Sequence, residues 1–150
     1  MKYINRYTSL ILYFLFSSAT VQLLFPQENQ NCTLLGRWAN GPCYCVEVIE
    51  DIACLGNGGY LDMVDFSDPQ NPVVLSKTLL DGDIRGMTLR SGHVFLANGF
   101  AGLAVIDISN SDEPEVIARL PLSENDFAYD VEVNDTMAYV LGQYSFHIVD

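Results

Sequence analysis

The chain has 150 residues, of which 49% are hydrophobic and only 17% are charged, a composition that excludes an intrinsically disordered chain and suits one folded domain. Its formal net charge is −12, with 7 Lys and Arg against 19 Asp and Glu. So few basic residues exclude an extended phosphate-binding surface, and we expect no nucleic-acid partner.

The first predicted element is a secretory signal peptide over residues 1–19. Lys2 and Arg6 form its basic start, Leu10 to Phe16 its apolar run, and Ser17-Ser18-Ala19 its cleavage region. The run is short for a membrane span and no stop-transfer pattern follows, so an uncleaved anchor is the less favoured alternative. Cleavage would leave 5 Lys and Arg against 19 Asp and Glu, a formal charge of −14. We expect a secreted or cell-surface protein with no membrane span after cleavage.

Residues 20–33 are expected to be a linker to the first strand, and all four cysteines lie between positions 32 and 54. In an oxidising compartment, such a group favours disulfides over free thiols. A zinc site with four thiolates is the less favoured alternative, because the spacing lacks paired C-x2-C knuckles. We predict a disulfide between Cys32 and Cys43, because both lie outside the strands that we expect.

Three similar segments follow, each made of short apolar runs that Gly, Asn and Asp separate. Their equivalent residues Asp65, Asp107 and Asp150 are 42 and 43 residues apart. This period, with runs rich in Val, Ile, Leu, Phe and Tyr, is typical of four-stranded β-propeller blades rather than of a helical repeat. The runs are Val46-Glu47-Val48, Ile52 to Leu55 and Tyr60 to Asp65; Met87-Thr88-Leu89, Val94 to Ala97 and Gly102 to Asp107; Val131-Glu132-Val133, Ala138 to Leu141 and Ser145 to Asp150.

A fourth strand completes the first two segments, at Val73 to Leu79 and at Glu115 to Leu120, each after a turn that contains proline. Leu35 to Trp38 aligns with these fourth strands. The propeller part of the chain therefore begins on a last-type strand, which in closed propellers pairs with the final three strands. Within each segment the first two strands should form a hairpin, with turn residues that suit positive φ angles at Glu50-Asp51, Ser91-Gly92 and around Asn134-Asp135.

The run from Gly102 to Asn110 resembles the signature of the LVIVD-repeat β-propellers, and Tyr60 to Ser67 and Phe146 to Asp150 are weaker copies of it. The resemblance covers residues 34–150. It departs from the pattern in the third segment, where His147 takes the position of Asp62 and Ala104. It implies an all-β fold of four-stranded antiparallel blades in a secreted or surface protein of bacterial type, and it implies no defined reaction.

The third segment reaches Asp150 before its fourth strand, whereas a closed ring takes at least about four blades. We therefore expect residues 34–150 to form an incomplete propeller of about two and a half to three blades. The remaining blades of the same, longer polypeptide would cover its open ends, because an uncovered end leaves apolar surface in water.

Two acidic runs and two histidines are the candidate metal-binding or catalytic groups. Asp65 and Asp107 each open a D-x-S-[DN] run after an apolar strand. Their carboxylates either bind calcium or, as repetition along the chain favours, accept backbone N–H groups within a turn. His93 and His147 lie near no Ser or Cys nucleophile motif. We therefore expect no catalytic residue, no metal site and no cofactor, and thus no enzyme.

The connections between blades are the expected binding surface. Leu80 to Arg85 and Pro121 to Ala128 should cluster with the glycine-rich loops at one end of the central channel, where loops on a rigid scaffold usually carry binding. Four carboxylates would make this end acidic and suited to a cation or a basic protein: Asp81, Asp83, Glu124 and Asp126. Six aromatic residues either stack on sugars or, as is favoured, pack between blades: Trp38, Tyr44, Tyr60, Tyr129, Tyr139 and Tyr144.

Taken together, these features predict an extracellular or cell-surface, non-enzymatic scaffold that binds a protein or a polysaccharide through its blade loops. The alternative is an exported hydrolase or lyase with its active site in the propeller channel, using blades absent from this stretch of chain. Acidic or His residues that line the channel in several blades would favour the enzyme.

Overall fold

The computed structural model describes residues 33–37, 41–123 and 125–150. The predicted signal peptide and most of the predicted linker, together with Cys32 and Trp38, lie outside the described residues. The chain divides into two compact units, Met1–Leu34 and Leu35–Asp150, and every described strand belongs to the second. Among the described residues there is no helix of the length and apolar character that crossing a membrane would take.

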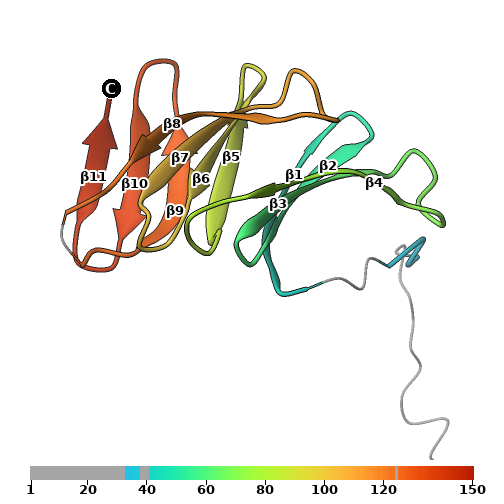
Figure 1. The fold of residues 1–150 in the computed structure, drawn as a ribbon, viewed down its shortest axis with the longest axis horizontal. Coiled ribbons are helices and arrows are strands. Elements are labelled where there is room, and N and C mark those ends of the chain that lie inside the picture. The colour runs from blue at the N-terminus through green and yellow to red at the C-terminus, as the bar shows by residue number, and fades with distance from the viewer. Residues whose placement is uncertain (1–32, 38–40, 124) are drawn as a thin grey trace, which may run out of the picture. The chain divides into compact units, whose positions relative to one another are not determined.

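The second unit contains three antiparallel sheets that follow one another in chain order (Figure 1). The described strands are β1 (Cys43–Ile49), β2 (Ile52–Asn57), β3 (Tyr60–Asp65) and β4 (Val73–Leu79) in the first sheet, β5 (Gly86–Arg90), β6 (His93–Ala97), β7 (Leu103–Asp107) and β8 (Glu115–Leu120) in the second, and β9 (Ala128–Val133), β10 (Ala138–Gly142) and β11 (Phe146–Val149) in the third. Within each sheet, every strand pairs with the strand that precedes or follows it in the chain. The predicted all-β fold, an incomplete propeller of four-stranded antiparallel units, is confirmed.

The hairpin turns between first and second strands form where they were predicted, by two different means. Ser91 and Gly92 both take positive φ angles, of 50° and 78°, and Glu50 has a φ of 53°. Such angles match the twist of the strands that the turn joins. The third turn relies on a side chain instead, because Asn134 Oδ1 accepts the backbone N–H groups of Thr136 at 3.1 Å and Met137 at 2.9 Å.

The sheets pack face to face through the buried apolar side chains of their strands. One buried cluster joins the first and second sheets: Cys54, Leu61, Met63, Leu80, Ile84, Met87, Val94, Leu96, Ala104, Ile106 and Ile108. Another joins the second and third sheets: Ala97, Leu103, Ala128, Val131, Ala138 and Val140. Burying one Leu, Ile or Val side chain stabilises by about 1.5–3 kcal/mol, so these two layers hold the blades together.

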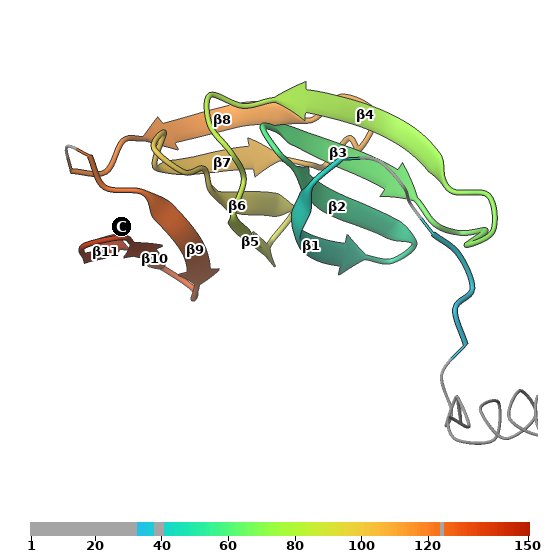
Figure 2. The same cartoon turned by 90° about the horizontal axis from the view of Figure 1, so that it is seen from below.

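The first strands of the three sheets lie on the same side of the unit, and the fourth strands β4 and β8 lie on the other (Figure 2). β5 contacts both β1 and β9. The approach of β5 to β9 is close, because a Cβ atom added to Gly86 would lie 2.7 Å from the Cα atom of Asp130 and 2.9 Å from the carbonyl oxygen of Tyr129. A residue with a side chain at position 86 would push these strands apart.

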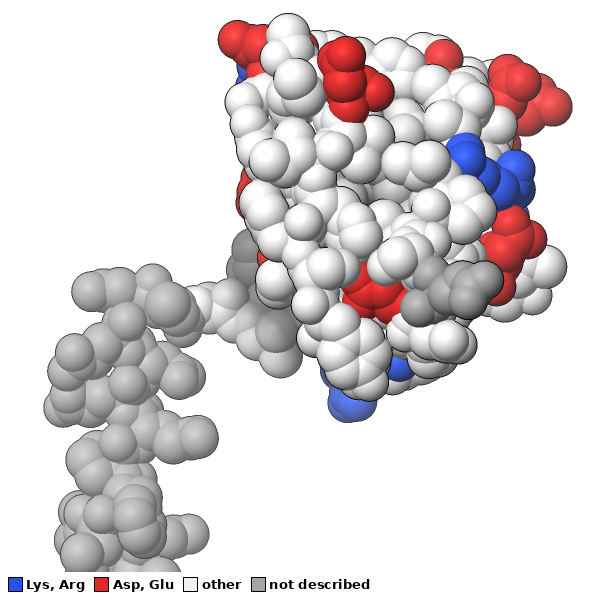
Figure 3. All heavy atoms as spheres, turned by 90° about the vertical axis from the view of Figure 1, so that its left-hand side faces the viewer, with Lys and Arg blue, Asp and Glu red and all other residues white. Residues whose placement is uncertain are grey.

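The open edge of the third sheet lies at β11, which pairs only with β10 among the described strands. A groove of about 550 Å³ lies beside it, between the second and third sheets, and Ala118, Leu120 and Val149 are among its lining residues. Leu141, Phe146 and Ile148 expose 51%, 60% and 62% of their surface. Seen from this side, the middle of the molecule carries few charged side chains (Figure 3).

The repeated aspartates at the ends of the third strands β3 and β7 stabilise turns, as predicted. Asp65 Oδ1 accepts the backbone N–H of Ser67 at 2.7 Å, and Asp107 Oδ1 accepts that of Ser109 at 2.8 Å. These hydrogen bonds favour the charged carboxylate, so they lower the pKa of both side chains. The same short turn therefore carries the chain from the third to the fourth strand in the first two sheets.

Candidate functional site

The blade connections and the glycine-rich loops meet at one end of the sheets. In the first connection, Leu80 N–H and Ile84 N–H donate to the carbonyl oxygens of Gly59 and Gly58, each at 2.8 Å. In the second connection, Ala128 N–H donates to the carbonyl oxygen of Gly99 at 2.9 Å. Gly99 has a φ of +57°, a conformation that glycine adopts without strain. Each glycine-rich loop thus fixes the connection that follows it.

The first strands of the first and third sheets each contain an extra residue near their start that interrupts the regular pairing. In β1, Cys43 pairs with Asn57 and Cys45 with Gly56, so Tyr44 is inserted between them. In β9, Ala128 pairs with Gly142 and Asp130 with Leu141, so Tyr129 is inserted. Bulges of this kind turn a side chain away from the regular face of a sheet.

Arg85 holds the equivalent position in the second sheet. Its N–H donates to the carbonyl oxygen of Ala97 at 2.9 Å, and Ala97 also pairs with Gly86. Gly86 corresponds to Cys45 and Asp130 in the registers of the other two sheets. Tyr44, Arg85 and Tyr129 are therefore one structural position in three successive blades.

Arg85 lies between aromatic rings that come from different blades. Its Cζ atom is 4.3 Å from the ring centroid of Tyr44 and 5.3 Å from that of Phe127. Phe127 also contacts Phe100, with centroids 4.8 Å apart and planes at 88°, and Tyr129, with centroids 4.9 Å apart and planes at 50°. A cation over an aromatic face stabilises by roughly 0.5–2 kcal/mol. We call Tyr44, Arg85, Phe100, Phe127 and Tyr129 the aromatic rim.

The aromatic rim is open to solvent. Phe100 exposes 71% of its surface, Tyr44 50% and Tyr129 46%. Apolar rings cost free energy where they face water, and a contiguous group of them marks a surface that a ligand covers. This group is the strongest candidate binding site among the described residues.

The prediction that four carboxylates make this end acidic is wrong for Asp126. Asp81 pairs with Arg119 at 2.9 Å, and Asp83 pairs with Arg85 at 3.0 Å, although both carboxylates remain exposed. Asp126 is only 3% exposed, so it contributes no surface charge for a cation. Burial without bonded partners would be costly for a carboxylate, and Asp126 has several such partners. Glu124, the fourth predicted member, lies outside the described residues.

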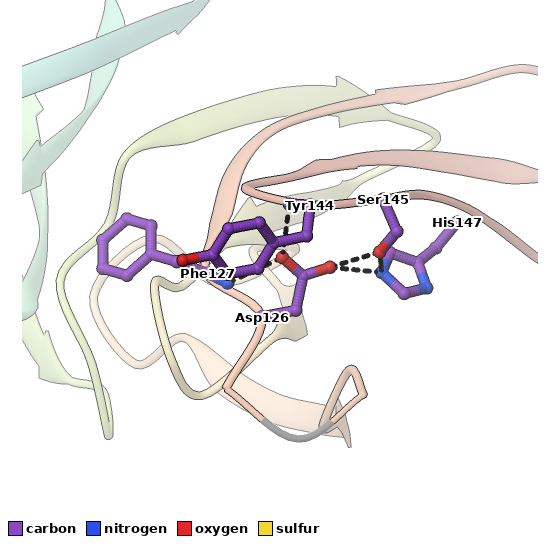
Figure 4. Close-up of polar contacts among 5 residues, drawn as sticks. All are labelled: Asp126, Phe127, Tyr144, Ser145 and His147. Carbon is purple, nitrogen blue, oxygen red and sulfur yellow. Dashed lines mark hydrogen bonds and ion pairs between the residues drawn. The ribbon is translucent and has the colours of Figure 1, made fainter.

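Asp126 accepts hydrogen bonds from four groups and thereby links the β8–β9 connection to the third sheet (Figure 4). Its Oδ1 atom accepts the N–H groups of Phe127 at 3.0 Å and Tyr144 at 3.1 Å. Its Oδ2 atom contacts Ser145 Oγ and lies 2.8 Å from His147 Nε2. The hydrogen bonds from His147 and Ser145 hold the pKa of Asp126 well below its ordinary value.

The Ser, His and Asp side chains of this cluster do not form a catalytic relay. His147 Nε2 faces both Asp126 Oδ2 at 2.8 Å and Ser145 Oγ at 2.7 Å. In a relay the carboxylate orients one ring nitrogen, and the other ring nitrogen takes the proton of the hydroxyl. Here one nitrogen contacts both groups. The arrangement fixes the loop that carries Phe127.

The family of the chain follows from a comparison with known repeats. The model of the LVIVD repeat matches residues 41–78 and 81–119. The chain belongs to the LVIVD-repeat family. No curated protein matches it.

The two matched ranges in this LVIVD-repeat protein cover the first and second sheets. The third sheet lies beyond them, repeats the order of their first three strands, and repeats the bulge in the first strand of the first sheet. His147 stands where Asp62 stands in the first sheet. Asp62 is fully buried, and there Lys77 Nζ at 2.8 Å and Asn57 Nδ2 at 3.0 Å contact its Oδ2 atom. The third sheet replaces this arrangement with His147 and a carboxylate from a loop.

The described cysteines of the LVIVD-repeat protein show no metal site. Cys45 and Cys54 pack in or against the first buried cluster, and burial raises the pKa of each thiol to about 11. Among the described residues, no three His, Cys, Asp or Glu side chains come together as metal ligands. The predicted disulfide between Cys32 and Cys43 stays a prediction, because Cys32 lies outside the described residues.

Sequence reasoning named Tyr44 and Tyr129 only as members of a larger aromatic set and did not single out Arg85, Phe100 or Phe127. The sequence did contain a signal for part of the rim. Tyr44, Arg85 and Tyr129 each stand directly before the residue that begins the regular pairing of a first strand, at Cys45, Gly86 and Asp130.

The favoured prediction that the listed aromatic residues pack between blades is wrong for Tyr60 and Tyr144, which expose 45% and 78% of their surface. Tyr139 has an aromatic neighbour, but within its own sheet. It stacks on Phe146 with centroids 6.1 Å apart.

Proposed function

We propose that this LVIVD-repeat protein is an exported, non-enzymatic β-propeller scaffold, secreted or held at the cell surface, that binds a protein or a polysaccharide through the aromatic rim. The observation that carries the proposal is the exposure of Tyr44, Phe100 and Tyr129 in one contiguous group. Rings on a scaffold of paired strands are held in place before a ligand arrives, which reduces the entropy lost on binding.

Export is supported by the basic start, apolar run and small residues of the first nineteen positions. The strong acidity of the chain suits a protein that stays soluble outside the cell. An oxidising compartment would also allow the disulfide between Cys32 and Cys43. Cell fractionation and N-terminal sequencing of the full chain test this part. A processed chain that begins after Ala19 outside the cytoplasm is expected, and an unprocessed cytoplasmic chain would overturn it.

The non-enzymatic assignment is supported by the surroundings of both histidines. His93 Nδ1 lies 2.9 Å from the carbonyl oxygen of Ser91 in its own hairpin turn. His147 is engaged with Asp126 through the nitrogen that also faces Ser145. The test is a set of ester, peptide and glycoside substrates given to the full chain and to a His147→Ala variant. We expect no turnover by either, and turnover that the variant loses would contradict the proposal.

Binding through the aromatic rim is tested with Tyr44→Ala and a matched control. Tyr44 and Ile117 are equally exposed, at 50%, but Ile117 lies on the fourth strand β8, away from the rim. The full chain and both variants are applied to immobilised polysaccharides and peptides. We expect Tyr44→Ala alone to weaken retention, and equal retention of all three proteins would contradict the proposal.

A further inference from the structure

We infer that the ligand of the aromatic rim is a protein segment that carries Lys or Arg side chains next to apolar ones. This inference rests on the proposed function, because it takes the rim to be a ligand-binding surface, and it chooses a protein over a polysaccharide. Three features of the rim support that choice: the angles between its rings, its residue types and the charges around it.

The rings of the aromatic rim do not make a flat platform. Phe100 and Phe127 meet edge to face at 88°, and Phe127 and Tyr129 are tilted by 50°. A chain of sugar rings that lies across several aromatic residues needs faces that point in one direction. Rings that stand at large angles leave recesses between them, and separate side chains of a protein fill such recesses. The ring geometry therefore favours a protein.

The residue types of the rim are those that dominate protein interfaces. Tyr and Arg are enriched where a few side chains carry most of the binding energy. Arg85 is also held in place, by Asp83 at 3.0 Å and by the rings of Tyr44 and Phe127. A guanidinium fixed in this way loses little freedom when a partner binds.

The charges of the chain disfavour an acidic ligand of the rim and favour a basic one. Residues 41–150 contain only four Lys and Arg residues, and each is paired with a carboxylate of the chain: Lys77, Arg85, Arg90 and Arg119. Every Lys and Arg of this range is therefore already engaged by a carboxylate of the chain, which leaves no unpaired Lys or Arg to bind a uronate or a sulfate group. Asp130 is exposed and follows Tyr129 directly. Opposite charge around an apolar centre speeds association and orients a basic partner.

A basic side chain of the partner also fits the rings themselves. Arg85 lies over Tyr44 and Phe127, and this contact shows that the rim accommodates a cation against an aromatic face. Phe100 and Tyr129 expose 71% and 46% of their surface. A Lys or Arg of the partner would contact these two rings and approach Asp130.

The experiment uses the full chain with two arms, an array of random dodecapeptides and an array of neutral and acidic polysaccharides. Peptides that bind are expected to be enriched in Lys and Arg beside apolar residues, and their affinity should fall as salt is added. Phe100→Ala should lower the affinity for the best-binding peptides by about tenfold or more. Ile117→Ala is the matched control and should leave the affinity for these peptides unchanged. A thermal melt checks that Phe100→Ala remains folded.

The outcomes separate this inference from the proposed function. Polysaccharide binding that depends on Phe100, without peptide binding, overturns the inference and leaves the proposed function standing. Peptides without basic residues, or peptides that bind Phe100→Ala as well as the unchanged chain, also overturn the inference. If no peptide and no polysaccharide binds in a way that depends on Phe100, both the inference and the proposed function are overturned. Asp130→Asn gives a second readout, because it should lower the affinity for basic peptides and make that affinity depend less on the salt concentration.

Discussion

Oδ2 of Asp126 lies 2.8 Å from Nε2 of His147, although Asp126 belongs to the connection between β8 and β9 and His147 to β11. Gly142 makes this approach possible, because a Cβ atom added to it would lie 2.7 Å from Cγ of Asp126. The carboxylate thereby fixes the start of the third sheet and the position of Phe127 beside it. We therefore expect the position of Phe127 and the stability of the third sheet to depend on this one buried side chain.

Asp126→Asn should destabilise the third sheet. The amide retains one oxygen acceptor, but its NH₂ group faces the donors that the second carboxylate oxygen accepted, and the charge is lost. The urea midpoint of unfolding is expected to fall clearly. Asp112→Asn is the control, because Asp112 is exposed in the turn before the fourth strand of the second sheet. An unchanged midpoint for Asp126→Asn would show that this network contributes no stability.

The stability of the folded chain should fall in acid because of the same carboxylate. The pKa of Asp126 is lowered from an ordinary value of 3.8, so the folded state holds the charged form more strongly than the unfolded state does. Its contribution is complete above the ordinary pKa and is lost as the pH falls below it. Urea unfolding between about pH 6 and about pH 2 should show a steeper loss for the unchanged chain than for Asp126→Asn. Parallel curves would contradict the assignment to Asp126.

Gly86→Ala should weaken the packing of β5 against β9. The added Cβ atom would lie 2.7 Å from Asp130 Cα and 2.9 Å from the Tyr129 carbonyl oxygen, and both are backbone atoms that cannot move without their strand. Overpacking of this kind costs roughly 1–3 kcal/mol in the free energy of unfolding. Gly59→Ala is the control, because its nearest neighbour would be at 3.5 Å, an ordinary contact. Equal thermal midpoints for the two variants would argue against close approach at Gly86.

Leu96→Ala should cost about 2–5 kcal/mol in the free energy of unfolding, because it empties part of the buried layer between the first two sheets. Leu96 is 0% exposed, whereas Leu79 is 63% exposed on β4. Chemical denaturation of Leu96→Ala and Leu79→Ala compares a buried with an exposed loss of the same atoms. If the two variants lose the same stability, the blades are not held together by this layer.

The thiols of Cys45 and Cys54 should resist alkylation while the chain is folded. Only the thiolate reacts, and burial raises the pKa of both groups to about 11. Iodoacetamide at neutral pH should label them only after unfolding, and peptide mapping by mass spectrometry measures this. If the chain is exported as proposed, the same map of the chain recovered outside the cytoplasm should contain the Cys32–Cys43 link. Rapid labelling of Cys54 in the folded chain, or a link that joins Cys43 to another cysteine, would contradict these expectations.

The sequence alone determined the blades, the hairpins and the aspartate turns of this LVIVD-repeat protein. Asp65, Asp107 and Asp150 are 42 and 43 residues apart. This period reflects sheets in which each strand pairs with a strand that precedes or follows it directly in the chain. Turn chemistry is local in the same sense, since Asp65 contacts the N–H only two residues later. Local preference and repeat length therefore agree, and the fold could be predicted.

Only the tertiary structure decided which side chains meet at the end of the sheets. Tyr44, Arg85 and Tyr129 are 41 and 44 residues apart, so they follow no single period, and what makes them equivalent is the register of paired strands. Asp126 was expected at the surface because it lies in the connection between two blades. It is buried because a glycine at position 142 leaves space for its carboxylate and because groups from residues 144 to 147 bond to it. Such contacts join residues distant in sequence, and no local pattern encodes them.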